Sequence, residues 1–151
     1  MFVLDTNHID VLKFAGPRCD LLRARLLPVQ AQVVTTIITV QENIEGWLAK
    51  INNARTPIPD AVRYYRKLED LLDFYTAWII LSFDERAGQE FSRLKGLRLR
   101  GVGVNDLKIA AIALCHGATV LTADTNHFER IPGVDVQDWL LDEPSDEPPI
   151  P

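Results

Sequence analysis

The chain has 151 residues and a formal net charge of -5, with 47% hydrophobic and 25% charged residues. This length predicts a single domain, and the balance of apolar and charged residues excludes a largely disordered chain. The longest apolar runs are far shorter than the roughly 20 residues that cross a bilayer, which excludes a membrane span. The N-terminus shows no secretory signal, and the two cysteines are compatible with a reducing compartment, so we expect a cytoplasmic protein.

The negative charge is concentrated at the C-terminal end of the chain. Residues 138–151 hold five acidic side chains and no Lys or Arg, whereas the rest of the chain has equal numbers of acids and bases. From Asp142 onward the acids are interspersed with four prolines, which cannot extend a helix or a strand. We therefore expect a folded domain over residues 1–141 and a disordered, acidic, Pro-rich tail over 142–151.

Short apolar and β-branched runs alternate with helical segments along the chain. The strands expected from these runs are residues 2–4, 33–38, 78–83 and 119–122, with a fifth, edge strand over 134–136. The helices expected between them cover about 7–14, 20–27, 40–51, 58–76, 85–95 and 105–116. Thr39 and Asp84 are expected to cap two helix starts, and Gly117 one helix end. This alternation predicts a three-layer α/β fold with a mostly parallel central sheet of four to five strands flanked by helices.

Four acidic residues follow the ends of strands or open helices. Asp5 comes directly after the first strand and Asp124 shortly after the fourth, while Glu42 and Asp106 lie in the first turns of two helices. The carboxyl ends of parallel strands form one edge of the sheet, so all four side chains could converge there. Clustered carboxylates repel one another unless a cation offsets their charge, and oxygen ligands favour one or two Mg²⁺ or Mn²⁺ ions over zinc. Such an ion activates water for attack on phosphorus, which predicts phosphodiester hydrolysis.

Three of these acids also have a simpler structural interpretation. Thr39 and Glu42 match a capping box, in which the glutamate satisfies backbone donors at a helix start. Asp106 and Asp124 could be ordinary first-turn or turn acids. The metal-site hypothesis therefore depends on the joint placement of the four residues.

Four short motifs in order resemble those of PIN-domain proteins, and more specifically of VapC-type toxins from toxin–antitoxin systems. The matching stretches are Leu4-Asp5-Thr6-Asn7, Glu42 with Gly46, Asn105-Asp106-Leu107-Lys108-Ile109-Ala110-Ala111, and Leu121-Thr122-Ala123-Asp124 with Phe128 and Gly133. Together they span residues 2 to about 140. One departure is Asn43, which stands where an apolar residue often follows the glutamate.

The resemblance implies a three-layer PIN-like fold and a magnesium- or manganese-dependent endoribonuclease. The family's acidic positions would be occupied by Asp5, Glu42, Asp106 and Asp124. Supporting polar positions around the metal would be occupied by Thr6, Asn7 and Thr122. The resemblance further implies an RNA substrate, a homodimer, and a cognate antitoxin whose tail covers the active-site groove.

Several other features allow two interpretations. Several basic residues lie close to Asp106 in a stretch that also contains glycines; they include Arg98, Arg100 and Lys108. These residues could bind substrate phosphates, or they could simply form a solvated surface. The three tryptophans are expected to be core or dimer anchors, and His127 is expected to be an exposed loop histidine.

Two other functional classes remain to be considered. The same fold could be a non-catalytic protein-interaction module whose acids are too far apart to hold a metal. A receiver-like signalling domain with Asp84 as its phosphorylated residue is disfavoured, because the acidic pair expected beside Asp5 is missing.

Overall fold

The computed structural model describes residues 1–53 and 55–141, so the tail expected over 142–151 lies outside the described residues. One five-stranded sheet forms the centre, with its strands in the order β3-β2-β1-β4-β5 and all four neighbouring pairs parallel. Its strands are β1 (Phe2–Leu4), β2 (Val33–Thr36), β3 (Ile80–Leu81), β4 (Thr119–Leu121) and β5 (Asp135–Gln137). The predicted parallel α/β sheet is confirmed.

Helices fill the connections between the strands. They are α1 (Thr6–Leu12), α2 (Pro17–Leu26), α3 (Ile37–Ile51), α4 (Ile58–Tyr75), α5 (Glu85–Gly96), α6 (Val104–His116) and α7 (Thr125–Phe128). A short 3₁₀ helix, η1 (Leu27–Gln32), joins α2 to β2. The sequence did not predict η1 or α7. Asp84 caps α5 by accepting a hydrogen bond from the Ala87 backbone N–H, and Gly117 ends α6 with a φ of 58°, as predicted.

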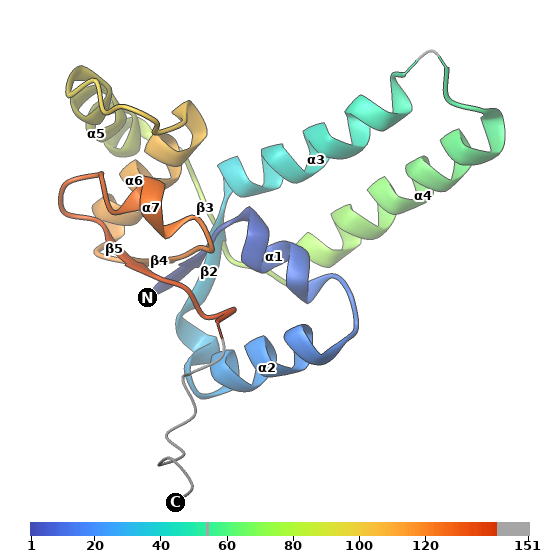
Figure 1. Cartoon of the computed structure of the whole chain (residues 1–151), viewed down its shortest axis with the longest axis horizontal. Helices are drawn as coiled ribbons and strands as arrows, with labels where there is room; N and C mark the ends of the chain where they lie inside the picture. Colours follow the sequence, from blue (N-terminus) through green and yellow to red (C-terminus); the bar gives the residue numbers. More distant parts are fainter. Residues whose placement is uncertain (54, 142–151) are drawn as a thin grey trace, which may run out of the picture.

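Each face of the sheet is covered by its own hydrophobic cluster. Alternate strand residues point to opposite faces, so Val3 and Val120 pack with the buried face of α6, whereas Leu4 and Leu121 pack with α1 and α2. Figure 1 shows the sheet between the α5 and α6 layer and the layer of α1 and α2. Buried apolar side chains on both faces confirm the three-layer architecture.

The start of α3 differs from the prediction. The hydroxyl of Thr36 accepts a hydrogen bond from the Thr39 backbone N–H over 3.1 Å, so Thr36 is the cap residue and the helix begins at Ile37. Capping by Thr39 and a strand continuing to residue 38 are therefore both wrong. Cap formation at Thr36 and burial of Ile38 in the core outweigh the β propensity of these isoleucines. The predicted strand over 78–83 is likewise reduced to Ile80–Leu81.

Two long helices extend away from the sheet. In Figure 1, α3 and α4 run alongside each other and are joined at the end far from the strands. The tryptophans pack in aromatic clusters on the α1, α2 and α4 side: Trp47 contacts Tyr64, Trp78 contacts Phe74, and Trp139 contacts Phe2. Within the described residues, no helix is both long and apolar enough to span a membrane.

Candidate functional site

Asp5 lies where β1 ends and α1 begins, at the carboxyl edge of the sheet. Its side chain is buried, with Oδ1 accepting from the Thr6 backbone N–H at 2.7 Å and Oδ2 accepting from the Thr122 hydroxyl at 2.8 Å. Burial raises the pKa of Asp5 to about 6, while the hydrogen bonds from Thr122 and Thr6 oppose this shift. The negative charges of Glu42 and Asp106 raise this pKa further, so both carboxylates act on Asp5 electrostatically.

Glu42 connects three helices at this edge. Its carboxylate accepts hydrogen bonds from the Thr6 hydroxyl of α1 and, over 2.9 Å, from the Asn105 side-chain amide of α6. Because Thr36 is the cap of α3, Glu42 lies beyond the first turn and the capping-box interpretation is wrong. The side chain is therefore directed to the site. Asn105 begins the family-like motif that contains Asp106, but the contact between Asn105 and Glu42 was not predicted.

Asp106 and Asp124 approach the same histidine from different elements. The Nδ1 atom of His127 lies 2.6 Å from Asp124 Oδ2 and 3.9 Å from Asp106 Oδ2. Asp106 also accepts a hydrogen bond from the Gly103 backbone N–H at 3.0 Å, so its predicted role at a helix start is confirmed beside its place in the site. His127, expected in an exposed loop, is half-buried on α7. The three-residue spacing from Asp124, one helical turn, is the sequence signal that was missed.

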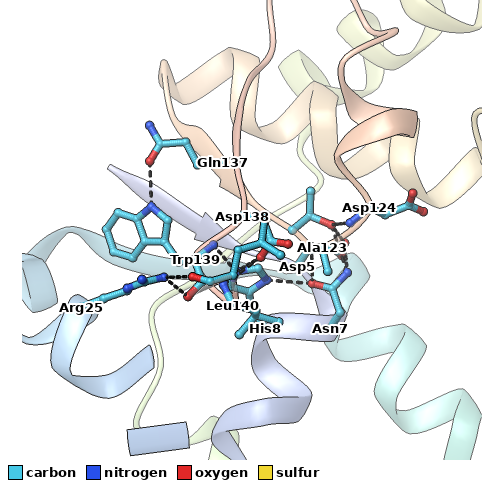
Figure 2. Close-up of polar contacts among 12 residues, drawn as sticks. Asp5, Asn7, His8, Arg25, Ala123, Asp124, Gln137, Asp138, Trp139 and Leu140 are labelled. Atoms are coloured by element: carbon cyan, nitrogen blue, oxygen red, sulfur yellow. Dashed lines mark hydrogen bonds and ion pairs between the residues drawn. The ribbon is translucent and has the colours of Figure 1, made fainter. Parts of the chain in front are cut away.

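The supporting polar residues named from the resemblance surround Asp5. Asn7 donates its amide N–H groups to Thr122 Oγ1 at 3.0 Å and to Asp5 Oδ2 at 3.3 Å. Thr122 Oγ1 in turn accepts from the Asp124 backbone N–H at 3.0 Å, which ties the loop after β4 to β1. Figure 2 shows Asn7 beside Asp5 and the segment carrying Ala123 and Asp124, and its amide contacts both.

The chemistry of the donor set fits a hard divalent cation. The four acids provide carboxylate oxygens, each with two lone pairs, so an oxygen that accepts one hydrogen bond can still bind an ion. The unfavourable charge interactions at Asp5 are those that a cation would relieve. Among residues 1–53 and 55–141, however, no three acidic, His or Cys side chains form a ready-made metal-binding group. Instead, the acids are connected through neighbouring polar side chains. Thr6 contacts both Asp5 and Glu42, and Asn105 contacts Glu42. His127 lies next to both Asp106 and Asp124.

Comparisons with known proteins identify the family of this chain. The PIN domain family model matches residues 2–134. The chain belongs to the PIN-domain family. A VapC ribonuclease of Sinorhizobium fredii is 34% identical over 143 residues, covering 90% of this chain and 95% of the relative, which places this PIN domain among the VapC-type proteins.

Solved structures of toxin–antitoxin and related complexes share the fold of this PIN domain. One chain of the DNA-bound VapBC structure from Salmonella typhimurium is 27% identical, with a TM-score of 0.72 over 91% of this chain and 97% of that one. One chain of FitAcB from Neisseria gonorrhoeae is 25% identical, with a TM-score of 0.66 over 92% of this chain and 98% of that one.

The basic residues expected to bind substrate occupy two positions in this PIN domain. Arg98 and Arg100 are exposed in the connection between α5 and α6, and Lys108 is half-buried on α6. The Arg100 carbonyl accepts a hydrogen bond from Arg130 at 3.0 Å, which holds this connection beside α7. Phosphate binding by the three residues stays a prediction.

Asn43, the departure from the family pattern, is accommodated by polar partners. Its amide donates to the Thr39 carbonyl at 3.2 Å, and its oxygen accepts from Lys13. Lys13 also pairs with Asp10 over 2.5 Å. The substitution thus adds a polar contact between α1 and α3 and removes none of the four acids.

Proposed function

We propose that this PIN domain is a magnesium- or manganese-dependent endoribonuclease that hydrolyses RNA phosphodiester bonds, and that it is the toxin of a VapBC-type pair. The observation that carries the proposal is the gathering of acids at the carboxyl edge of the sheet, where Thr6 contacts both Asp5 and Glu42. His127 likewise lies next to both Asp106 and Asp124. The similarity to a VapC ribonuclease supports the same activity. We expect it to act on RNA in the cytoplasm.

In this proposal the metal ligands are Asp5, Glu42, Asp106 and Asp124, holding one or two ions. A bound ion would stabilise negative charge on the phosphate and make water a better nucleophile. The hydroxyls of Thr6 and Thr122 orient the carboxylates of Glu42 and Asp5 by donating to them. His127 Nδ1, 2.6 Å from Asp124 Oδ2, holds the Asp124 carboxylate.

The flanking basic residues would bind the phosphates next to the scissile bond. Arg98 and Arg100 are exposed, and within the described residues neither forms an ion pair with an acid of the site. Both side chains can therefore contact RNA without first breaking such an ion pair. Phosphate contacts of this kind position a nucleic acid without reading its sequence.

RNA cleavage by the purified protein tests the proposal. Wild-type protein is incubated with total cellular RNA in Mg²⁺ or in EDTA, beside Asp106→Asn and the matched control Asp135→Asn, which changes an exposed acid at the opposite edge of the sheet. We expect fragments from wild type and control in Mg²⁺, and none with EDTA or from Asp106→Asn. Cleavage by Asp106→Asn equal to wild type would contradict the assignment. Absence of cleavage in every sample would favour the interaction module.

We further propose that an antitoxin binds beside the acids. A groove of about 310 Å³ runs from Thr6 and Glu42 to Phe14 and Trp47, and a second hollow shares Phe14 and Trp47. The exposed side chain of Phe14 offers an apolar anchor that lacks cover in the described structure. An apolar helix of the antitoxin could occupy the groove, with a basic side chain directed to the carboxylates.

A homodimer is also part of the proposal. The α4 helix carries exposed apolar side chains that a second copy could cover, among them Ile58, Val62 and Leu72. Sedimentation or light scattering of the purified protein measures the oligomeric state. A monomer at all concentrations tested would contradict this part of the proposal.

A further inference from the structure

His8 is a fully buried histidine to which the sequence alone assigns no role. It lies on α1 directly after Asn7, and each ring nitrogen has a partner from a different part of the chain. The Trp139 backbone N–H donates to Nε2 over 3.1 Å, and Nδ1 lies 2.8 Å from the amide oxygen of Asn7. Because Nε2 accepts, the neutral ring carries its hydrogen on Nδ1 and donates it to Asn7.

The surroundings of His8 keep its ring neutral. Burial lowers the pKa of His8 to about 4, although the carboxylate of Asp138, 3.6 Å from Nε2, acts in the opposite direction. Asp138 itself accepts from the Leu140 backbone N–H at 2.8 Å. A neutral imidazole has one donor and one acceptor, which are the two roles that Asn7 and Trp139 require.

The hydrogen bond from His8 is one of two that set which way the Asn7 amide faces. The Asn7 oxygen also accepts from the Ala123 backbone N–H at 2.9 Å. With two donors at its oxygen, the amide turns its nitrogen toward Thr122 and Asp5, to which it donates. The reversed amide would place N–H groups against both donors and would lose its hydrogen bonds to the site.

The segment that contacts His8 is itself held in place. Arg25 of α2 donates to the carbonyl oxygens of Trp139 at 2.8 Å and Leu141 at 2.6 Å. The Trp139 ring packs against Phe2 of β1, with the ring centroids 4.9 Å apart. Residues 138–141 are called the C-terminal segment here. Figure 2 shows the resulting series of contacts from Arg25 through Trp139 of this segment to His8, Asn7 and Asp5.

We propose that His8 is a positioning residue: held by the C-terminal segment, it fixes the Asn7 amide so that Asn7 donates to the Asp5 carboxylate. The inference rests on the proposed ribonuclease function and deepens it. In this inference the C-terminal segment, which follows β5, helps to orient the Asp5 carboxylate. Arg25, far from the acids in sequence, acts on the same carboxylate by holding that segment.

Three substitutions of His8 in the full-length chain separate positioning from simple burial. His8→Asn places an amide N–H where Nδ1 stands and can still donate to Asn7. His8→Gln places its amide nearer to Nε2 and lacks that donor, and His8→Leu lacks both polar groups. Ile9→Val removes a buried methyl group from the next position and serves as the control for lost packing.

The measurements are kcat and KM for RNA, Mg²⁺ affinity by calorimetry, and urea unfolding of each variant. We expect His8→Gln and His8→Leu to lower kcat or Mg²⁺ affinity by about 10- to 100-fold with little change in KM for RNA. His8→Asn should stay close to wild type, and so should Ile9→Val. Equal losses in His8→Asn and His8→Leu, or losses that only follow the decrease in stability, would overturn the inference.

A spectroscopic readout separates this inference from the proposed function. The ¹⁵N resonances of the Asn7 side-chain amide and the Ala123 backbone amide report the hydrogen bonds directly. They should shift in His8→Leu and Arg25→Met but stay near wild type in His8→Asn. If wild type cleaves no RNA, the proposed function fails, yet these shifts would still support the positioning role. Unchanged resonances in His8→Leu and Arg25→Met would overturn it whether or not RNA is cleaved.

Discussion

At the residue scale, the buried carboxyl of Asp5 dominates the electrostatics of the site. Its pKa is raised from 3.8 to about 6, so the folded protein binds a proton there more tightly than the unfolded chain does. The stability that protonation contributes is fully present below pH 3.8 and is lost as pH rises through about 6. Ionised Asp5 therefore destabilises the metal-free protein at neutral pH, and a cation would relieve that cost.

Replacing Asp5 by Asn removes this titration. The free energy of unfolding of Asp5→Asn, relative to wild type, should increase by up to about 3 kcal/mol between pH 4 and pH 7, because two pKa units correspond to roughly that energy. Urea unfolding in EDTA measures it. His8 titrates in both proteins and so cancels in the difference. Asp135→Asn should run parallel to wild type, and a parallel profile for Asp5→Asn would contradict the raised pKa.

The sequence was sufficient to predict where acids that follow strand ends or open helices lie, whereas their role as metal ligands stays a prediction. Asp5, Asp106 and Asp124 could be found because a parallel sheet brings its strand ends to one edge. The hydrogen bonds of His8 and Asn105 could not, because their partners Trp139 and Glu42 are distant in sequence. Nothing in local spacing identifies such partners.

At the element scale, the start of α3 determines where Glu42 points. Two threonines in a β-branched stretch, Thr36 and Thr39, could each cap a helix, and local propensity favours continuing the strand to residue 38. The structure selects Thr36, because a helix that begins at Ile37 buries Ile38 and Val40 in the core. Choosing the cap required knowledge of the packing that sequence periodicity does not supply.

Removing the Thr36 hydroxyl should weaken this helix start. Thr36→Val keeps the shape of the side chain but leaves the Thr39 backbone N–H without its acceptor, so we expect the free energy of unfolding to fall by about 1–2 kcal/mol. Thr36→Ser keeps the hydroxyl and should retain the cap. Urea unfolding compares both variants with wild type, and a Thr36→Val variant as stable as wild type would show that the cap contributes nothing.

At the scale of the whole molecule, alternating strands and helices were sufficient to predict three layers and a parallel sheet. The projecting pair α3 and α4 and the groove beside it were not predictable, because they depend on how the two helices pack. The acidic tail expected over residues 142–151 stays a prediction, since it lies outside the described residues.

The groove predicts which surface residue an antitoxin needs. Phe14 is 63% exposed, so Phe14→Ala should leave folding and RNA cleavage unchanged while weakening antitoxin binding about 10-fold or more. Ile79→Ala, which shortens an equally exposed apolar side chain outside this groove, is the control. Titration with the cognate antitoxin measures affinity. Equal affinity of Phe14→Ala and wild type would exclude this groove as the binding surface.

Titration with Mg²⁺ or Mn²⁺ tests the central claim most directly, because it asks whether all four carboxylates contribute to metal binding. Calorimetry at pH 7.5 compares wild type with Asp5→Asn, Glu42→Gln, Asp106→Asn, Asp124→Asn and the control Asp135→Asn. We expect wild type and the control to bind with similar affinity, and each of the four site variants to bind more weakly or not at all. Absence of binding to wild type, or the same affinity in all six proteins, would contradict the account.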